Sequence, residues 1–126
     1  MKLAMDQALY LSPMIPTFNL KETISFFSDV LEFESVMETE SYCIMAKDHL
    51  TVHLLRAGAE IGQMEFYLQV QNIDQVWNSI KDKIQDLKHK VPFDQEYGMR
   101  EIHIAVPQTN TLMFIGSEIG SSAPKQ

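Results

Sequence analysis

Few residues of this sequence have a type and spacing that could do chemistry. No Ser-His-Asp arrangement, phosphate-binding loop or nucleotide motif occurs in the sequence. Catalysis without a metal would therefore depend on His53 or Glu65 acting as a single acid or base. The one cysteine, Cys43, lies in the apolar run 42–46, which predicts a buried small hydrophobic side chain rather than a nucleophile. A single cysteine also excludes an internal disulfide and a CxxC metal site.

The charge balance bears on the partners. The chain has 10 Lys+Arg and 17 Asp+Glu, a net charge of 10 − 17 = −7. This acidity argues against nucleic acid as a partner, because phosphates need a basic surface. It weakly favours a cationic small ligand, although an acidic surface that keeps a cytosolic protein soluble explains the same balance. The residues 1–7 match neither a signal peptide nor a membrane span, so we expect a cytoplasmic protein without a membrane partner.

Two segments have the apolar spacing of amphipathic helices. The first begins at the N-cap Asn19, with Glu22 placed three residues on as in a capping box. The second begins at Asn72, and the two caps are 72 − 19 = 53 residues apart. The apolar positions are Leu20, Ile24, Phe27, Val30 and Leu31 in the first, and Ile73, Val76, Trp77, Ile80 and Ile84 in the second. At this offset Leu20 meets Ile73, Ile24 meets Trp77, Phe27 meets Ile80 and Leu31 meets Ile84. The spacing indicates an internal repeat.

Strand-like runs surround both helices. Residues 63–70 alternate strictly between apolar and polar, which predicts a strand with one buried face, and residues 10–15 form the matching run before the first helix. Three runs follow each helix: 34–38, 42–47 and 50–55 after the first, and 90–93, 101–106 and 111–115 after the second. The order is βαβββ twice.

This order predicts one α+β domain over residues 1–126, with a first module of about 8–56, a second of about 63–118 and a tail of 119–126. We expect a cupped mixed sheet with the helices on its outer face and the inner face curved around a shared cavity. A ferredoxin-like domain, which leaves the other side of its sheet open to solvent, is the alternative.

Several short runs resemble the glyoxalase/bleomycin-resistance (vicinal oxygen chelate) superfamily. Phe18-Asn19-Leu20, Phe26-Phe27 and Leu31-Glu32-Phe33 are similar to its first helix and the following turn, with Glu32 in place of the usual Gly. The run 97–102, Tyr-Gly-Met-Arg-Glu-Ile, looks like the Trp-Gly-Met-Arg-Glu-Phe of bleomycin-resistance-like members. The turn 106–110 keeps only the Pro and the Asn of Asp-Pro-Asp-Gly-Asn. The resemblance covers about 9–118 and implies the same cupped fold.

The resemblance also implies four possible metal-ligand positions, at the first and last strand of each module. In this sequence they fall on Ser12, His53, Glu65 and Met113. Only His53 and Glu65 are good ligands, whereas a divalent site usually needs three. We therefore expect no metal and no other cofactor. Alternatively, His103 could join His53 and Glu65 in the two-His-one-carboxylate set of non-haem iron sites, although it does not stand at a superfamily ligand position.

The strand faces directed away from the helices are expected to line a small-molecule pocket with aromatic, thioether and polar groups. They would carry Tyr10, Ser12, Met14, Thr51, His53, Glu65, Tyr67, Thr111 and Met113. From these and the bleomycin-resistance-like run we expect the ligand contacts to be Ser12, His53, Glu65, Tyr67, Arg100 and Met113. Glu65 would be the anionic anchor and His53 a polar partner. Arg100 could orient a ligand carboxylate or brace its strand.

Two functions of different class follow from the resemblance. The first is a binding protein without catalytic residues that sequesters a small cationic or aromatic compound. The alternative is a metal-dependent lyase, isomerase or dioxygenase, so the sequence leaves open whether the chain is an enzyme. We also expect a homodimer in which the first module of one chain and the second module of its partner form each cup.

Overall fold

The computed structural model describes residues 7–120, and most of the predicted tail lies outside them. The predicted order of elements is confirmed. The first module contains β1 (Met14–Thr17), α1 (Leu20–Asp29), β2 (Glu34–Glu38), β3 (Tyr42–Lys47) and β4 (Leu50–Arg56). The second contains β5 (Met64–Gln69), α2 (Ile73–Ile80), the short 3-10 helix η2 (Lys81–Lys83), β6 (His89–Asp94), β7 (Met99–Ala105) and β8 (Thr111–Glu118).

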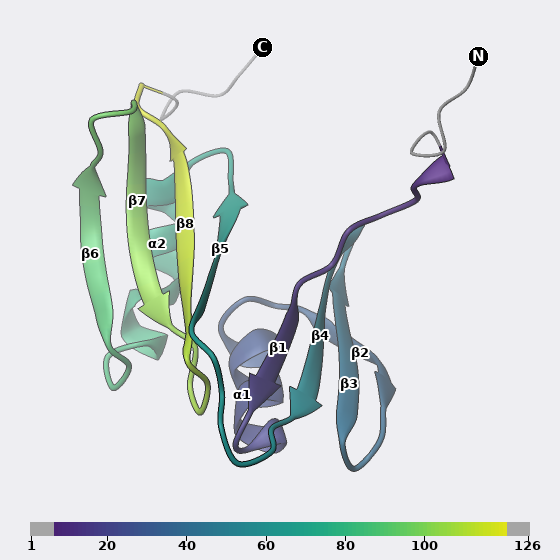
Figure 1. Ribbon diagram of the computed structural model, residues 1–126. Coiled ribbons are helices and arrows are strands. Elements are labelled where there is room, and N and C mark those ends of the chain that lie inside the picture. The colour runs from purple at the N-terminus through teal and green to yellow at the C-terminus, as the bar shows by residue number, and fades with distance from the viewer. Residues whose placement is uncertain (1–6, 121–126) are drawn as a thin grey trace.

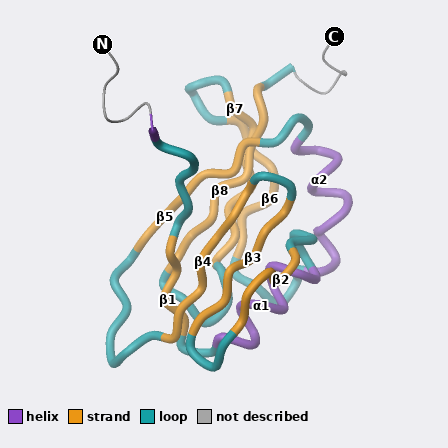
Figure 2. The backbone as a smooth tube through the Cα atoms, turned by 90° about the vertical axis from the view of Figure 1, so that its right-hand side faces the viewer, coloured by secondary structure: helices purple, strands orange, loops and turns teal. Residues whose placement is uncertain are grey.

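Each module forms one mixed sheet of four strands. The strand orders are β1-β4-β3-β2 and β5-β8-β7-β6, so both modules have the same topology. The first strand of each module runs parallel to the last, and the other pairs are antiparallel. The two sheets stand next to each other (Figure 1), and both helices lie on the same side of the strands (Figure 2). We call the sheet face that a helix covers the helix face, and the opposite one the inner face.

Both helices begin as the sequence predicts. The side chain of Asn19 accepts a hydrogen bond of 3.2 Å from the backbone N–H of Glu22, and Asn72 accepts one of 3.2 Å from the N–H of Gln75. These contacts satisfy one of the N–H groups that a helix start leaves without a partner. The side chain of Glu22 contacts the amide of Asn19 at 3.4 Å rather than its backbone, so the reciprocal half of the capping box is not formed.

A single hydrophobic core joins the two modules. It combines Phe27 and Leu54 of the first module with Ile104 and Ile115 of the second. Hydrogen bonds add to this packing where α1 meets the β7–β8 turn: the hydroxyl of Thr23 donates to the carbonyl of Pro107 at 2.9 Å, among others. Within one chain the modules are therefore held together on their helix faces, and among residues 7–120 no helix covers either inner face.

In the turn after α1, Glu32 stands where the resembling family usually has Gly. This residue has φ 63°, in the left-handed region where a side chain is strained and Gly is not. The usual Gly of the resembling pattern fits this geometry better than Glu does. The side chain of Glu32 instead forms an exposed ion pair with Lys47 at 3.5 Å.

The first strand differs from its predicted bounds. Strand β1 begins at Met14, where it pairs with His53, rather than at residue 10. The preceding segment is apolar but leaves the sheet (Figure 1). Leu9 and Leu11 in this segment are 92% and 97% exposed. The predicted run 10–15 therefore overlaps the sheet only at its end: the carbonyl of Pro13 accepts a hydrogen bond of 2.9 Å from the N–H of His53, whereas residues 10–12 pair with no strand in the described chain. Within residues 7–120 no helix is long and apolar enough to cross a membrane.

Candidate functional site

The inner face of the second sheet carries a row of rings, which we call the ring row: Tyr67, Phe114, His103 and Phe93. They come from β5, β8, β7 and β6, one from each strand. The ring centroids of Tyr67 and Phe114 lie 6.2 Å apart, those of Phe114 and His103 3.9 Å, and those of His103 and Phe93 5.0 Å. Strand pairing places them together, because Phe114 is the Cα partner of both Tyr67 and His103. The row presents aromatic surface across the width of the sheet.

A buried carboxylate lies beside the ring row. Glu101 of β7 is 0% exposed, and both of its oxygens are occupied. Its Oε1 accepts hydrogen bonds from Nε2 of His103 at 3.0 Å and from the amide of Gln95 at 3.1 Å. Its Oε2 accepts from the hydroxyl of Tyr67 at 2.9 Å and from that of Tyr97. Four donors saturate the carboxylate, so it orients its neighbours rather than offering a free acceptor to a ligand.

These contacts shift the pKa values of the groups involved. Burial alone would raise the pKa of Glu101, but the four donated hydrogen bonds outweigh it and hold the pKa below the usual value. The pKa of Tyr67 is raised, first by burial and then by its hydrogen bond to the carboxylate. The pKa of Tyr97 is raised chiefly by the hydrogen bond to Glu101. Both phenols therefore stay protonated donors at neutral pH.

The hydrogen bond to Glu101 determines which ring nitrogen of His103 carries the proton. Because Glu101 is ionised, Nε2 of His103 is the protonated nitrogen that donates to it. The other nitrogen, Nδ1, forms no hydrogen bond within residues 7–120. His103 was considered only as an additional metal ligand from the sequence, whereas the structure makes it the centre of the ring row.

The predicted ligand residues are divided between the two faces of the second sheet. Glu65 and Tyr67 lie on the inner face, as expected. Met113 and Thr111 do not: the pairing of Met113 with Ile104 places both on the helix face, where Met113 is 1% exposed. Their predicted orientation was wrong by one residue of register, because successive side chains of a strand point to opposite faces.

A cavity of about 470 Å³ nevertheless brings Tyr67 and Met113 together. It lies between the start of β4 and β5, and the exposed segment before β1 contributes Tyr10 to its wall. Ser12 belongs to the same segment, and its buried hydroxyl has no hydrogen-bond partner in the described chain. This cavity therefore collects residues from both modules.

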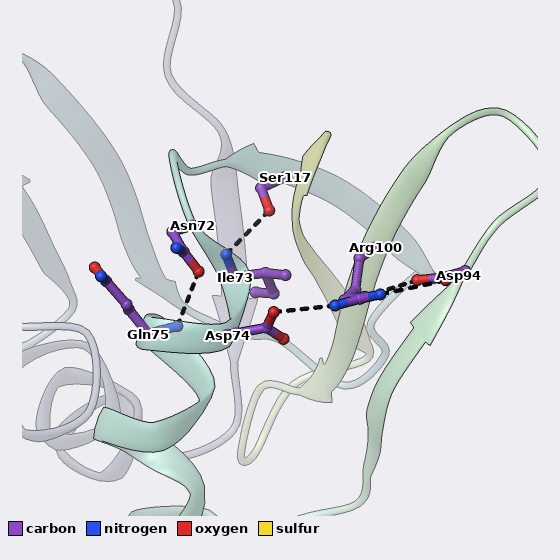
Figure 3. A network of polar contacts seen from close by, with 7 residues as sticks. All are labelled: Asn72, Ile73, Asp74, Gln75, Asp94, Arg100 and Ser117. Carbon is purple, nitrogen blue, oxygen red and sulfur yellow. Dashed lines mark hydrogen bonds and ion pairs between the residues drawn. The ribbon is translucent and has the colours of Figure 1, made fainter. Parts of the chain in front are cut away.

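Arg100 lies on the helix face of β7. Its guanidinium contacts Asp94 of β6 at 2.7 Å and Asp74 in the first turn of α2 at 3.0 Å (Figure 3). The hydrogen bond from Arg100 holds the pKa of Asp94 below its usual value. Nearby, the hydroxyl of Ser117 accepts a hydrogen bond of 3.0 Å from the N–H of Ile73 (Figure 3). Of the two roles considered for Arg100, bracing the strand against the helix start matches this geometry.

His53 lies on the inner face of the first sheet. Its Nδ1 is 2.6 Å from the hydroxyl of Tyr42, and the two rings meet edge to face. Glu65 lies on the other sheet, and no three His, Cys, Asp or Glu side chains within residues 7–120 are grouped as metal ligands. The set His53, Glu65 and His103 is therefore not assembled in one chain. The four superfamily ligand positions do not fit a metal there either, since Met113 faces the helix.

Sequence reasoning missed Glu101, Phe93 and Phe114 as components of the site. A signal for Glu101 was present: it stands two residues before His103, with Ile102 between them and Ile104 beyond. Ile102 and Ile104 both point toward the core, so Glu101 and His103, which alternate with them along the strand, share the opposite face. No comparable signal marked Phe93 or Phe114, because their contacts depend on the register between strands.

Comparison with known proteins identifies the fold. No family model and no curated protein sequence matches the chain. Among solved structures, a bleomycin resistance determinant encoded on the transposon Tn5 superposes with a TM-score of 0.76 and 16% identity over 88% of this chain and 98% of that chain. A bleomycin-binding protein complexed with bleomycin gives 0.73 and 17% over 88% and 99%. Lactoylglutathione lyase from Agrobacterium tumefaciens gives 0.71 and 15% over 94% and 98%. At these identities the matches show the fold.

Proposed function

The chain has the glyoxalase/bleomycin-resistance fold, and on this basis we propose that it is a small-molecule-binding protein that sequesters an aromatic compound. The observation that carries the proposal is the ring row on the inner face of the second sheet. Stacking on aromatic side chains provides both apolar contact and a defined orientation for a planar ligand. Solved structures with this fold include one in complex with bleomycin, which supports binding as the activity.

The charges beside the ring row suit a ligand with a positively charged group. Glu65 is exposed on the same face and two residues from Tyr67, and no ion pair holds it within residues 7–120. A charge-assisted hydrogen bond from a ligand cation to such a carboxylate contributes about 1.5–3 kcal/mol. His53 and Ser12 are proposed to contact the ligand from the first module.

The binding test uses bleomycin, an aromatic cation. Titration calorimetry should give saturable binding to the wild-type chain, and Phe93→Ala should weaken it about tenfold, as expected for the loss of one ring contact. The matched control is Phe18→Ala, since Phe18 is an exposed aromatic residue that contributes no ring to the row. Equal losses in both variants, or failure of a panel of aromatic cations to bind, would reject the ring row as the binding site.

We further propose that the chain forms a homodimer in which the inner faces of two chains complete each cup. The support is the exposed apolar segment that carries Leu9, Tyr10 and Leu11. Exposed apolar side chains in a row usually mark an interaction site, and a twofold arrangement would cover both copies at once. The unpaired backbone of this segment can add to a sheet of the partner.

Light scattering on a size-exclusion column measures this directly. The wild-type chain should elute as a dimer at micromolar concentration, and the double variant Leu9→Ser, Leu11→Ser should shift toward monomer. Val36→Ser with Val91→Ser is the control pair, because these residues are exposed on the edge strands β2 and β6. A monomeric wild-type chain would rule out the shared cup.

The enzyme alternative depends on a metal site that two chains would have to assemble. Elemental analysis of the purified protein is the deciding measurement. Less than about 0.1 equivalent of Zn, Ni, Mn or Fe per chain favours the binding protein, in line with the poor ligand set. Close to one equivalent, lost in both His53→Ala and Glu65→Ala, would favour the enzyme.

A further inference from the structure

His103 is the member of the ring row whose ring itself contains polar atoms. Its ring lies 3.9 Å from that of Phe114 at an angle of 33°, and it meets the ring of Phe93 edge to face at 5.0 Å. Only 8% of the residue is exposed. These contacts hold the ring in place, so the directions of its two nitrogens are set before a ligand binds. They determine which chemical groups of a ligand on the row find a partner.

The hydrogen bond to Glu101 occupies one of these nitrogens. Nε2 of His103 donates to the carboxylate at 3.0 Å. Donors from Tyr67, Tyr97 and Gln95 occupy the remaining acceptor capacity of the carboxylate. The two nitrogens of an imidazole point in nearly opposite directions, so Nδ1 is directed away from Glu101. With the proton held on Nε2, the Nδ1 of the neutral ring is an acceptor that has no proton to donate.

A cavity of about 390 Å³ lies on the side of His103 that faces away from Glu101. Its wall includes four residues of the inner face: Lys90, His103, Ala105 and Leu112. Ala105 follows His103 by two residues on β7 and pairs with Leu112, whereas Glu101 precedes His103 by two residues. Nδ1 forms no hydrogen bond within residues 7–120, and His103 is not among the described residues with a fully buried polar atom that lacks a partner. This acceptor therefore keeps contact with solvent.

We propose that His103 selects ligands whose ring carries an N–H or O–H group, which donates a hydrogen bond to Nδ1. Glu101 is the positioning residue for this contact, because it keeps the proton on Nε2. The proposal rests on the proposed function, since the ligand has to lie on the ring row. A ring that offers an acceptor or a methyl group at this point leaves Nδ1 without a partner and is disfavoured. With Glu65 as the contact for a cation, the ligand class is a cationic aromatic compound with a donor on its ring.

The first test examines the protein without a ligand. The ¹⁵N spectra of the histidine side chains at pH 8 report which nitrogen carries the proton, and the His103 signals are identified by their loss in His103→Phe. The wild type should show a protonated Nε2 and a bare Nδ1, and Glu96→Gln, a change at an exposed residue, should not differ. Glu101→Gln introduces an amide that can accept or donate, so a second tautomer should appear. A proton on Nδ1 in the wild type would overturn the proposal whether or not any ligand binds.

The second test compares tryptamine with 1-methyltryptamine, in which a methyl group replaces the ring N–H proton and the cation is kept. In calorimetric titrations the wild type and Glu96→Gln should bind tryptamine about three- to tenfold more tightly, as expected for one hydrogen bond. The preference should fall in Glu101→Gln and disappear in His103→Phe, which keeps a ring in the row. Equal affinities in the wild type, or a preference that persists in His103→Phe, would overturn selection by His103 and leave the ring row in place. Binding of neither compound would reject the ring row itself, and the selection with it.

Discussion

The phenol of Tyr67 crosses the neighbouring strand to donate a hydrogen bond of 2.9 Å to Glu101. Tyr67 is on β5 and Glu101 on β7, with β8 between them. The residue of β8 opposite Glu101 is Gly116. A Cβ placed there would collide with the hydroxyl of Tyr67 and lie 2.8 Å from the carbonyl oxygen of Arg100. The hydrogen bond can pass over β8 because Gly116 has no side chain.

We expect Gly116→Ala to destabilise the fold by about 1–3 kcal/mol, the usual cost of overpacking. The added methyl group displaces Tyr67 from Glu101 and also presses on the backbone of β7. Tyr67→Phe removes the hydroxyl that collides first, so the double variant should lose less free energy of unfolding than the sum of the single losses. Urea denaturation of all four proteins measures this coupling, and strict additivity would contradict the crossing geometry.

Glu101 should make stability depend on pH in the acid range. Its folded pKa is lowered, so its contribution is complete above the pKa of an unfolded Glu, about 4.3, and is lost as the pH falls through the folded pKa. Glu101→Gln should cost about 1–3 kcal/mol at pH 7 and flatten the loss of stability below about pH 4.3. Denaturation at pH 7, 5 and 3.5 tests this against Glu96→Gln, a change at an exposed residue of the turn that precedes β7. Parallel pH profiles in the two variants would show that the carboxylate is not held as an anion.

The two helices should respond differently to removal of their aromatic residues. Phe27 is 0% exposed and packs edge to face against Phe26 and Phe33, so Phe27→Ala should cost about 3–5 kcal/mol. Trp77 is only partly buried, where it contacts His89, so Trp77→Ala should cost clearly less. Thermal and urea unfolding give both values. Equal losses in free energy of unfolding would mean that Trp77 is also buried by a contact from outside this chain.

Arg100 should matter to α2 and not to the ligand. Arg100→Met removes the contacts to Asp74 and Asp94, which are partly exposed, so we expect a small loss of stability that high salt also produces in the wild type. Binding of bleomycin should be unchanged, because the guanidinium lies on the helix face. If Arg100→Met folds normally but no longer binds bleomycin, Arg100 belongs to the binding site.

Much of the fold could be predicted from the sequence, since local rules determine it. Asn19 and Asn72 cap helices because their side chains accept from N–H groups three residues away, and the apolar stripes at helical spacing mark the buried sides. The 53-residue offset predicted the repeat, and the shared topology of the two sheets confirms it. The orientation of Glu65 and Tyr67 followed from alternation within one strand.

Only the tertiary structure decided how the strands are aligned with one another. Met113 pairs with Ile104 and faces the helix, although its own sequence neighbourhood reads equally well with the opposite face inward. The contact of Tyr67 with Glu101 joins residues 34 positions apart and requires Gly116 on a third strand. Inter-strand register and packing depend on the whole sheet, so no local pattern specifies them. The sequence by itself therefore determined the elements and their repeat, whereas the site was formed by pairings between distant segments.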